Sequence, residues 1–406
     1  MWVEPEKPAS PRLHPPAMLN EVIEYLRCPS LAAEDSDEDS NEAKPDAVFL
    51  DATLGTAGHT LAMLAAHPTC RVIALDRDAD SMEFARQRLE AAGVANRVTL
   101  VCGDFRDAPQ LLQPFFEKQE VGSDGRSITQ IDGALIDAGM SLYQVTSPDR
   151  GLSFRIDAPL DMRYDRTQGV SAFDLVNRLP ASELEDLLFK FADERWARRI
   201  ATTIAAHRRS NVVRTTSELA SLVEAAIPVG VRRHARVHPA TKTFAALRLA
   251  VNDEFWALEQ GAWALSAVLA TAARLVILTY SSNEDRTVKR TFRRLAGRPV
   301  DSDIGRPRRK RKSAALSPEQ RASGTARSPL TFSLSLPTDD AEETLEASSV
   351  PAYMADAYAT GFGQTWGMRI VTPKPVVPTP EEIAANPLAR SCKLRAIEKY
   401  LIPPRD

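Results

Sequence analysis

The chain has 406 residues, more than one small domain needs, and 44% of them are hydrophobic, which allows a folded core and excludes global disorder. Its 51 basic residues nearly balance its 54 acidic ones, which excludes a strongly cationic nucleic-acid coat but not a local basic face. The 4 cysteines form no C-x-x-C pair, so we expect no metal site and a reducing compartment. No apolar run approaches the roughly 18 residues of a membrane span, so we expect no membrane partner.

Residues 1–46 are predicted to be an N-terminal extension with an acidic low-complexity run at 34–42. Short apolar runs and helical stretches then alternate along 47–140. The expected strands cover 47–51, 71–76, 97–101 and 131–137, and the expected helices cover 61–66 and 81–92. Strands that alternate with helices indicate βαβ units, so this part is predicted to be an α/β domain with a parallel sheet.

The alternation stops after the fourth predicted strand, and residues 141–270 are predicted to be an all-helical insertion. Two capping boxes, Ser182 with Glu185 and Thr215 with Glu218, predict helix starts. Apolar stripes at helical spacing predict core-facing helices: Leu184, Leu187, Leu188 and Phe191, and Phe244, Leu247, Val251, Phe255 and Leu258.

A strand expected at 274–280 returns the chain to the sheet, so residues 271–406 are predicted to be the second part of the α/β domain. This part holds a low-complexity insertion at about 299–349, which opens with a basic cluster at 306–312. The cluster is either an RNA contact or a mobile tail. An edge strand is expected at 368–372, and 381–402 closes the chain.

Acidic residues end the first, second and fourth predicted strands and follow the third, at the edge where ligands bind in open α/β sheets: Asp51, Asp76, Asp137 and Asp104. Gly55 and Gly58 allow a tight turn that aims helix N–H groups at a ligand. Asp76 is placed to meet ribose hydroxyls, and Phe105 offers an aromatic face for an adenine. The turn lacks a full pyrophosphate cradle and the acids suit a sulfonium cation, which favours S-adenosyl-L-methionine over a dinucleotide.

Longer motifs carry a family resemblance. They are Asp51 to Thr60, Asp76-Arg77-Asp78, Gly103-Asp104-Phe105, Asp132 to Gly139, Asp149 to Phe154, Pro159 to Arg163, His238 to Arg248, Val251 to Glu254, Glu284 to Arg290, and Glu381 to Pro387 with Lys393 to Arg395. In this order the motifs resemble the RsmH (MraW-type) family, the cytosine-N4 methyltransferases of small-subunit ribosomal RNA. The resemblance runs through most of the chain.

The resemblance implies a class I S-adenosylmethionine-dependent methyltransferase, with a Rossmann-like sheet and an all-helical insertion domain after the fourth strand. It implies that the partner is small-subunit ribosomal RNA or the assembling small subunit. Asp137 is the expected catalytic residue, as acceptor or proton sink for the target amine. The residues implied for cofactor binding are Ala57, Gly58, His59, Asp76, Phe105, Asp137 and Gln144.

Departures from the family pattern leave a second function open. Thr56 and Ala57 stand where the family has more glycine, Leu142 replaces a serine, and Ser281 replaces a histidine. The alternative to an active enzyme is therefore a small-subunit assembly factor that has lost turnover. The low-complexity additions predict an organellar member in the mitochondrion, with the cytoplasm as the alternative.

Several further residues have two interpretations each. Ser141 and Tyr143 either position the base or are structural, Asp161 and Arg163 either form a structural pair or serve the site, and His238 either caps the local chain or lies near RNA. Five basic side chains either meet phosphates or are solvated: Lys242, Arg248, Arg286, Lys289 and Arg290.

Overall fold

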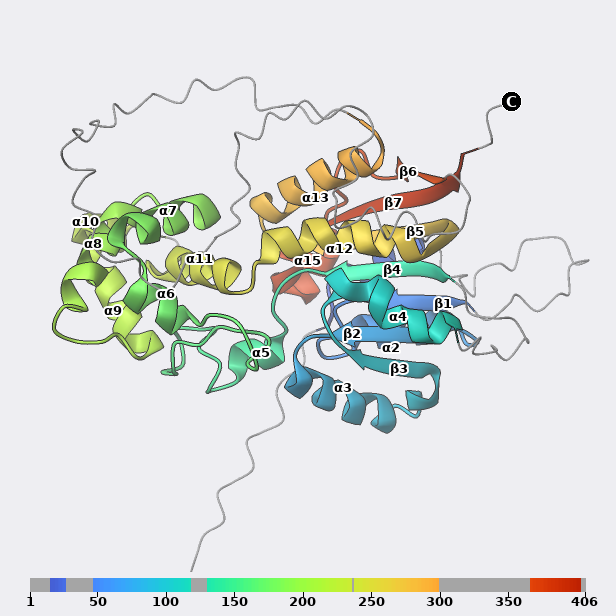
Figure 1. Cartoon of the computed structure of the whole chain (residues 1–406), viewed down its shortest axis with the longest axis horizontal. Helices are drawn as coiled ribbons and strands as arrows, with labels where there is room; N and C mark the ends of the chain where they lie inside the picture. The colour runs from blue at the N-terminus through green and yellow to red at the C-terminus, as the bar shows by residue number, and fades with distance from the viewer. Residues whose placement is uncertain (1–14, 27–46, 118–129, 236, 299–365, 403–406) are drawn as a thin grey trace, which may run out of the picture.

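The computed structural model describes residues 15–26, 47–117, 130–235, 237–298 and 366–402. Figure 1 shows a sheet flanked by helices, with a separate group of helices, drawn in green, to one side of it. The acidic run at 34–42, the basic cluster at 306–312 and the insertion at 299–349 lie outside the described residues, so their interpretations stay predictions.

The sheet has 7 strands in the order β3-β2-β1-β4-β5-β7-β6. The first five strands pair in parallel, whereas β7 runs antiparallel to both β5 and β6. Their bounds are β1 Val48–Asp51, β2 Arg71–Asp76, β3 Val98–Cys102, β4 Ile131–Asp137, β5 Leu269–Thr279, β6 Trp366–Ile370 and β7 Lys393–Leu401. The expected Rossmann-like sheet is confirmed, and β1 and β4 fill the centre, so their carboxyl ends open onto the middle of the ligand-binding edge.

Strand β7 was not predicted, because its sequence is rich in charged residues. These side chains are nevertheless buried and paired: Arg395 donates to Asp285 (2.7 Å), Glu398 accepts from Arg274 (2.8 Å), and the Lys399 ammonium donates to main-chain carbonyls of α12 and β5. Pairing satisfies each buried charge, which allows a charged strand to lie inside the sheet.

Helices cover both faces of the sheet because consecutive strand residues point to opposite sides. Phe49 faces one apolar cluster with α1, α2 and α3, whereas Leu50 faces another with α4, α12 and α13. The bounds are α1 Leu19–Leu26, α2 Gly58–Ala66, α3 Ala79–Ala91, α4 Ala108–Glu117, α12 Glu254–Val268, α13 Ser282–Leu295 and α15 Pro380–Ala385. Short connections contain α5 Leu142–Thr146 and the 3-10 turns η1 Ala95–Arg97, η2 Phe105–Asp107 and η4 Pro387–Ser391.

The helical insertion has a core of its own, which includes Leu184, Leu188 and Leu247. Its helices are α6 Ala172–Arg178, α7 Ala181–Ala192, α8 Ala197–His207, α9 Thr216–Ala226, α10 Val229–Arg233 and α11 Thr241–Val251. The capping box at Thr215 is confirmed, but the one predicted at Ser182 is wrong: the N-cap of α7 is Pro180, two residues earlier, and it makes no side-chain cap.

The insertion also ends before the predicted boundary at residue 270. Helix α12 packs Leu258 and Leu265 into the core of the sheet, and β5 already begins at Leu269. The apolar stripe predicted as one helix is split, because Asp253 adopts a left-handed backbone (φ 52°) between α11 and α12. By its packing, α12 therefore belongs to the α/β domain.

Candidate active site

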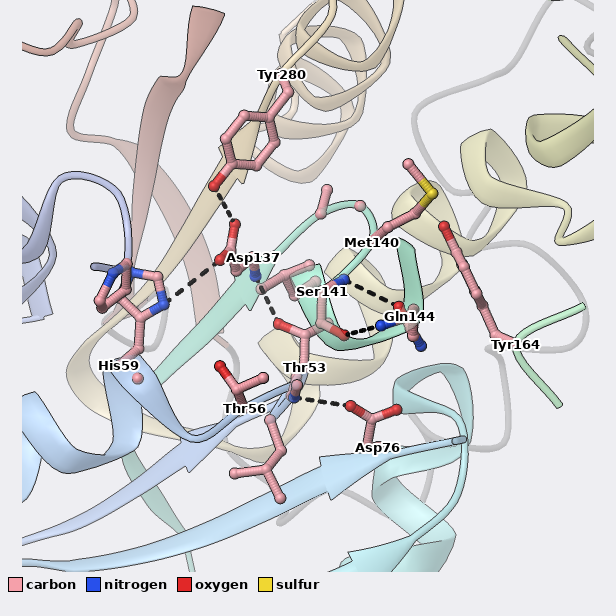
Figure 2. A pocket seen from close by; sticks show the side chains of 18 of the residues that line it. Thr53, Thr56, His59, Asp76, Asp137, Met140, Ser141, Gln144, Tyr164 and Tyr280 are labelled. Carbon is pink, nitrogen blue, oxygen red and sulfur yellow. Dashed lines mark hydrogen bonds and ion pairs between the residues drawn. The ribbon is translucent and has the colours of Figure 1, made fainter. Parts of the chain in front are cut away.

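A cavity of about 400 Å³ opens at the carboxyl ends of the parallel strands (Figure 2). Loops after β1, β2, β3 and β4 form one side of it, and Tyr164 and Arg248 of the helical insertion, with Glu254 at the start of α12, form the other. The predicted residues Gly58, His59, Asp76, Phe105, Asp137 and Gln144 all line this cavity. The structure thus brings together side chains that lie up to 86 positions apart, from Gly58 to Gln144.

The turn between β1 and α2 brings the main chain close to the cavity. Gly55 adopts φ 50° and donates its N–H to Asp76 Oδ2 at 2.8 Å. Ala57 adopts φ 61° as the residue before α2, but its side chain is fully buried and does not line the cavity. A Cβ at Gly58 would lie 2.9 Å from Pro16 Cγ, so a larger residue there meets the N-terminal segment as well as any ligand.

Asp76 and Phe105 lie on the side of the cavity formed by β2 and β3. Both Asp76 oxygens accept main-chain N–H groups, from Gly55 (2.8 Å) and Asp78 (2.9 Å), which orients the carboxylate. Burial nevertheless raises the pKa of Asp76 to about 6. The Phe105 ring lies against Gly261 of α12, where a Cβ would come within 2.2 Å of the ring, so this glycine makes room for the aromatic face.

Asp137 lies at the end of β4 and faces two polar side chains (Figure 2). The Tyr280 hydroxyl donates to Oδ1 at 2.8 Å, and His59 Nδ1 lies 3.5 Å from Oδ2. The Asp137 N–H donates to the Thr53 hydroxyl at 2.7 Å, which ties the strand end to the glycine turn. Burial raises the pKa of Asp137, with His59 and Tyr280 opposing the shift, so the carboxylate is a stronger proton acceptor than an exposed aspartate.

Gln144 and Ser141 form a capping box at the start of α5: the Ser141 N–H donates to Gln144 Oε1, and the Gln144 N–H donates to the Ser141 hydroxyl. The Gln144 side-chain amide also donates to Asp78 Oδ2 at 2.8 Å. Ser141 therefore has a structural role at the start of α5, but it also lines the cavity, so its role in positioning the base stays a prediction. Tyr143 stacks on Phe84 and does not line the cavity, which favours its structural interpretation too.

Arg248 belongs to a charged cluster on the insertion side of the cavity, and its side chain is only 16% exposed, so the interpretation as a solvated side chain is wrong. Its role as a phosphate contact stays a prediction. Its guanidinium donates to both oxygens of Glu254 (2.8 and 3.1 Å) and lies 3.8 Å from Glu284. The Tyr164 hydroxyl donates to the same Glu254 at 3.1 Å. The cluster joins α11, α12 and α13, and so couples the insertion to the α/β domain.

The other candidates have structural partners as well. Arg163 donates to both oxygens of Asp161, and His238 Nδ1 accepts the Ala240 N–H at 3.2 Å, so the structural pair and the local cap are confirmed. Lys242 donates to a main-chain carbonyl, Arg286 donates to a neighbouring asparagine, and both side chains are exposed, as is Lys289. Their role as phosphate contacts stays a prediction.

Two terminal segments complete the cavity, and the sequence did not predict either. Pro15, Pro16 and Ala17 line it from the N-terminal side, and Asn386 and Leu388 line it from the C-terminal side. A hydrogen bond joins the two segments: the Asn386 side-chain amide donates to the Pro15 carbonyl at 2.9 Å. The contact joins residues 371 positions apart, which no local pattern can signal.

Comparison with known proteins identifies the family. The model of the MraW methylase family matches residues 12–317. The chain belongs to this family. The family assignment and the strand order together confirm the class I methyltransferase fold expected from sequence.

Curated relatives match between 72% and 96% of this chain. A protein of Thermobifida fusca named ribosomal RNA small subunit methyltransferase H is 36% identical over 390 residues, which is 96% of this chain and 94% of the relative. A protein of the same name from Geobacter sp. (strain M21) is 36% identical over 88% of this chain and 93% of its own length. The one from Mycolicibacterium paratuberculosis is 40% identical over 72% of both chains.

In the part of the chain that the structure describes, no helix is both long and apolar enough to cross a bilayer. The same residues contain no group of three or more histidine, cysteine or acidic side chains arranged to hold a metal ion.

Proposed function

We propose that this member of the methylase family transfers a methyl group to N4 of a cytosine in small-subunit ribosomal RNA. The observation that carries the proposal is Asp137: a partly buried carboxylate of raised pKa, oriented by Tyr280, in the cavity where the ends of β1, β2 and β4 meet. The relatives are named as small-subunit ribosomal RNA methyltransferases, which supports the substrate. The compartment stays a prediction, the mitochondrion, with the cytoplasm as the alternative.

The methyl donor is S-adenosyl-L-methionine, and the cavity has groups that fit its parts. Asp76 can accept hydrogen bonds from the two ribose hydroxyls, and the Phe105 ring can cover the adenine. The start of α2 at Gly58 can present main-chain N–H groups to the methionine carboxylate. In this arrangement the left-handed backbone of Ala57 shapes the turn before α2, and its side chain does not contact the cofactor. Gln144 supports the loop after β4 through its hydrogen bond to Asp78.

The cofactor supplies an activated methyl group on a positively charged sulfur. The cytosine amine is a weak nucleophile because its lone pair is delocalised into the ring, so the protein must lift the base from its stack and align the amine with the methyl carbon. Asp137 can accept a hydrogen bond from the amine and take its proton as the new bond forms. This chemistry needs no metal and no covalent intermediate on the protein.

The test is transfer of tritium from labelled S-adenosylmethionine to small-subunit RNA and to precursor subunits, followed by nucleoside digestion. The proposal predicts label in N4-methylcytidine. Label in another nucleoside would contradict the proposed position. If the purified chain binds subunits but transfers no label to any assembly intermediate, the assembly-factor alternative replaces the proposal.

The raised pKa of Asp76 predicts that cofactor binding weakens in acid. Ribose hydroxyls need the ionised carboxylate as acceptor, and with a pKa of about 6 this form is lost as the pH falls from 7 to 5. The affinity for S-adenosylhomocysteine is therefore expected to be about tenfold lower at pH 5 than at pH 7. Calorimetric titration with S-adenosylhomocysteine measures this pH dependence of the affinity. The sulfur of this ligand is neutral, so a sulfonium charge does not contribute.

The variant Asp76→Asn is the control for this titration. An amide has no proton to gain over this range, so the variant should bind weakly and without the acid step. A wild-type affinity that stays constant between pH 5 and pH 7 would exclude Asp76 as the ribose acceptor.

A further inference from the structure

The His59 ring lies between a main-chain carbonyl and a carboxylate, and its exposed fraction is 6%. Nε2 is 3.0 Å from the Ala17 carbonyl oxygen, and Nδ1 is 3.5 Å from Asp137 Oδ2 (Figure 2 shows the second contact). A carbonyl oxygen can only accept, so Nε2 carries a proton. In a neutral imidazole Nδ1 then has a lone pair, and that lone pair faces the carboxylate.

A lone pair facing an ionised carboxylate is repulsive, and one proton between the two groups turns the contact into an attraction. The other carboxylate oxygen, Oδ1, already accepts the Tyr280 hydroxyl at 2.8 Å. Tyr280 therefore holds the carboxylate with Oδ2 toward the imidazole. Ala17 and Tyr280 together orient the two groups from opposite ends.

We propose that His59 and Asp137 hold one proton between them in the free protein, and that binding of the positively charged methyl donor expels this proton. The inference rests on the proposed function, because it takes S-adenosylmethionine as the ligand. It gives His59 a positioning role that acts through Asp137, beyond its place in the wall of the cavity.

The surrounding groups favour a bound proton. Asp51, fully buried on β1, also interacts electrostatically with both His59 and Asp137, and Tyr280 and Cys392 face Asp137 from the segments that follow β5 and precede β7. None of these three groups is a cation. Burial raises the pKa of Asp137, in the direction that retains a proton.

In this proposal the site holds either the proton of the His59–Asp137 pair or the positive charge of the cofactor sulfur at each stage of the reaction. As the donor binds, one positive charge enters the site and one proton leaves. In the transfer, the amine nitrogen bonds to the methyl carbon, the carbon–sulfur bond breaks with its electron pair kept by sulfur, and one amine proton passes to Asp137. The sulfur is then neutral and the His59–Asp137 pair has its proton again, so the net charge of the site is unchanged.

The test is calorimetric titration of the full chain near neutral pH in buffers of different ionisation enthalpy, which counts the protons released on binding. S-adenosylmethionine is expected to release up to about one proton more than S-adenosylhomocysteine, whose sulfur is neutral. Both ligands share the ribose and the methionine amine, so a proton released from Asp76 cancels in the difference. Equal proton release by the two ligands would overturn the inference and leave the proposed function standing, whereas failure of both ligands to bind would count against both.

Two variants assign the proton. His59→Gln keeps an amide donor for the Ala17 carbonyl but cannot share a proton with Asp137, so the difference between the ligands should fall close to zero. Asp137→Asn removes the carboxylate of the pair, so it should also abolish the difference in proton release between the two ligands. The control is His207→Gln at the end of α8 in the insertion, which should retain the wild-type difference. A difference that persists in His59→Gln but disappears in Asp137→Asn would place the proton on Asp137 alone and overturn the shared pair.

Discussion

Replacing Asp137 with asparagine is expected to lower methyl transfer by about 10²-fold or more while the fold stays intact. The amide oxygen can still accept from the Tyr280 hydroxyl, and the amide N–H₂ can donate to His59 Nδ1, so both partners remain satisfied. The variant loses the negative charge and the site that takes the amine proton. Tritium transfer to small-subunit RNA measures the loss, and the thermal midpoint of unfolding checks the fold.

Asp132→Asn is the matched control for this substitution. Asp132 lies near the start of the same strand, β4, and its carboxylate accepts the Val48 N–H at 2.7 Å, a role that an amide oxygen can keep. It is outside the cavity, so its transfer rate should be unchanged. Wild-type activity in Asp137→Asn would remove this carboxylate from the mechanism.

Arg248→Met is expected to destabilise the chain by about 3–5 kcal/mol, because it leaves two buried carboxylates without their shared cation. Methionine fills most of the arginine volume, so the loss reports on charge rather than on a cavity. Without the arginine, the pKa of Glu284, already raised by burial, rises further. Since the folded carboxylates then bind protons more readily than the unfolded ones, the destabilisation should be largest at neutral pH and shrink as the pH falls.

Urea unfolding at pH 5 and pH 8 measures the loss in the free energy of unfolding. Two further variants test whether the loss comes from the removed charge. Arg286→Met removes an exposed arginine that hydrogen-bonds to the Asn283 side chain on the same helix, and it should change stability by less than about 0.5 kcal/mol. Adding Glu254→Gln to Arg248→Met should recover part of the loss, because it removes one of the unpaired charges. A loss below about 1 kcal/mol for Arg248→Met would show that the cluster is hydrated in solution.

Local sequence patterns were sufficient for the parallel half of the sheet. Strand β4 matches its predicted bounds of 131–137, because the apolar run at 133–136, which ends in an acid, identifies a buried central strand, and only Asp132 near its start is exposed. The acids at the ends of β1, β2 and β4 can likewise be recognised from the local sequence. Since the carboxyl ends of parallel strands meet at one edge, the gathering of Asp76, Phe105 and Asp137 around one cavity followed from the strand assignments.

Other features depend on contacts between residues far apart in the chain, and only the tertiary structure decided them. Arg248 reads as a helix-surface cation in the sequence, yet folding places it between two carboxylates from later helices. Strand β7 reads as a charged tail, yet each of its charges finds a partner from an earlier segment. The proton arrangement at Asp137 needs Ala17, His59 and Tyr280 within a few ångströms of one another, and that distance is set by packing rather than by spacing along the chain.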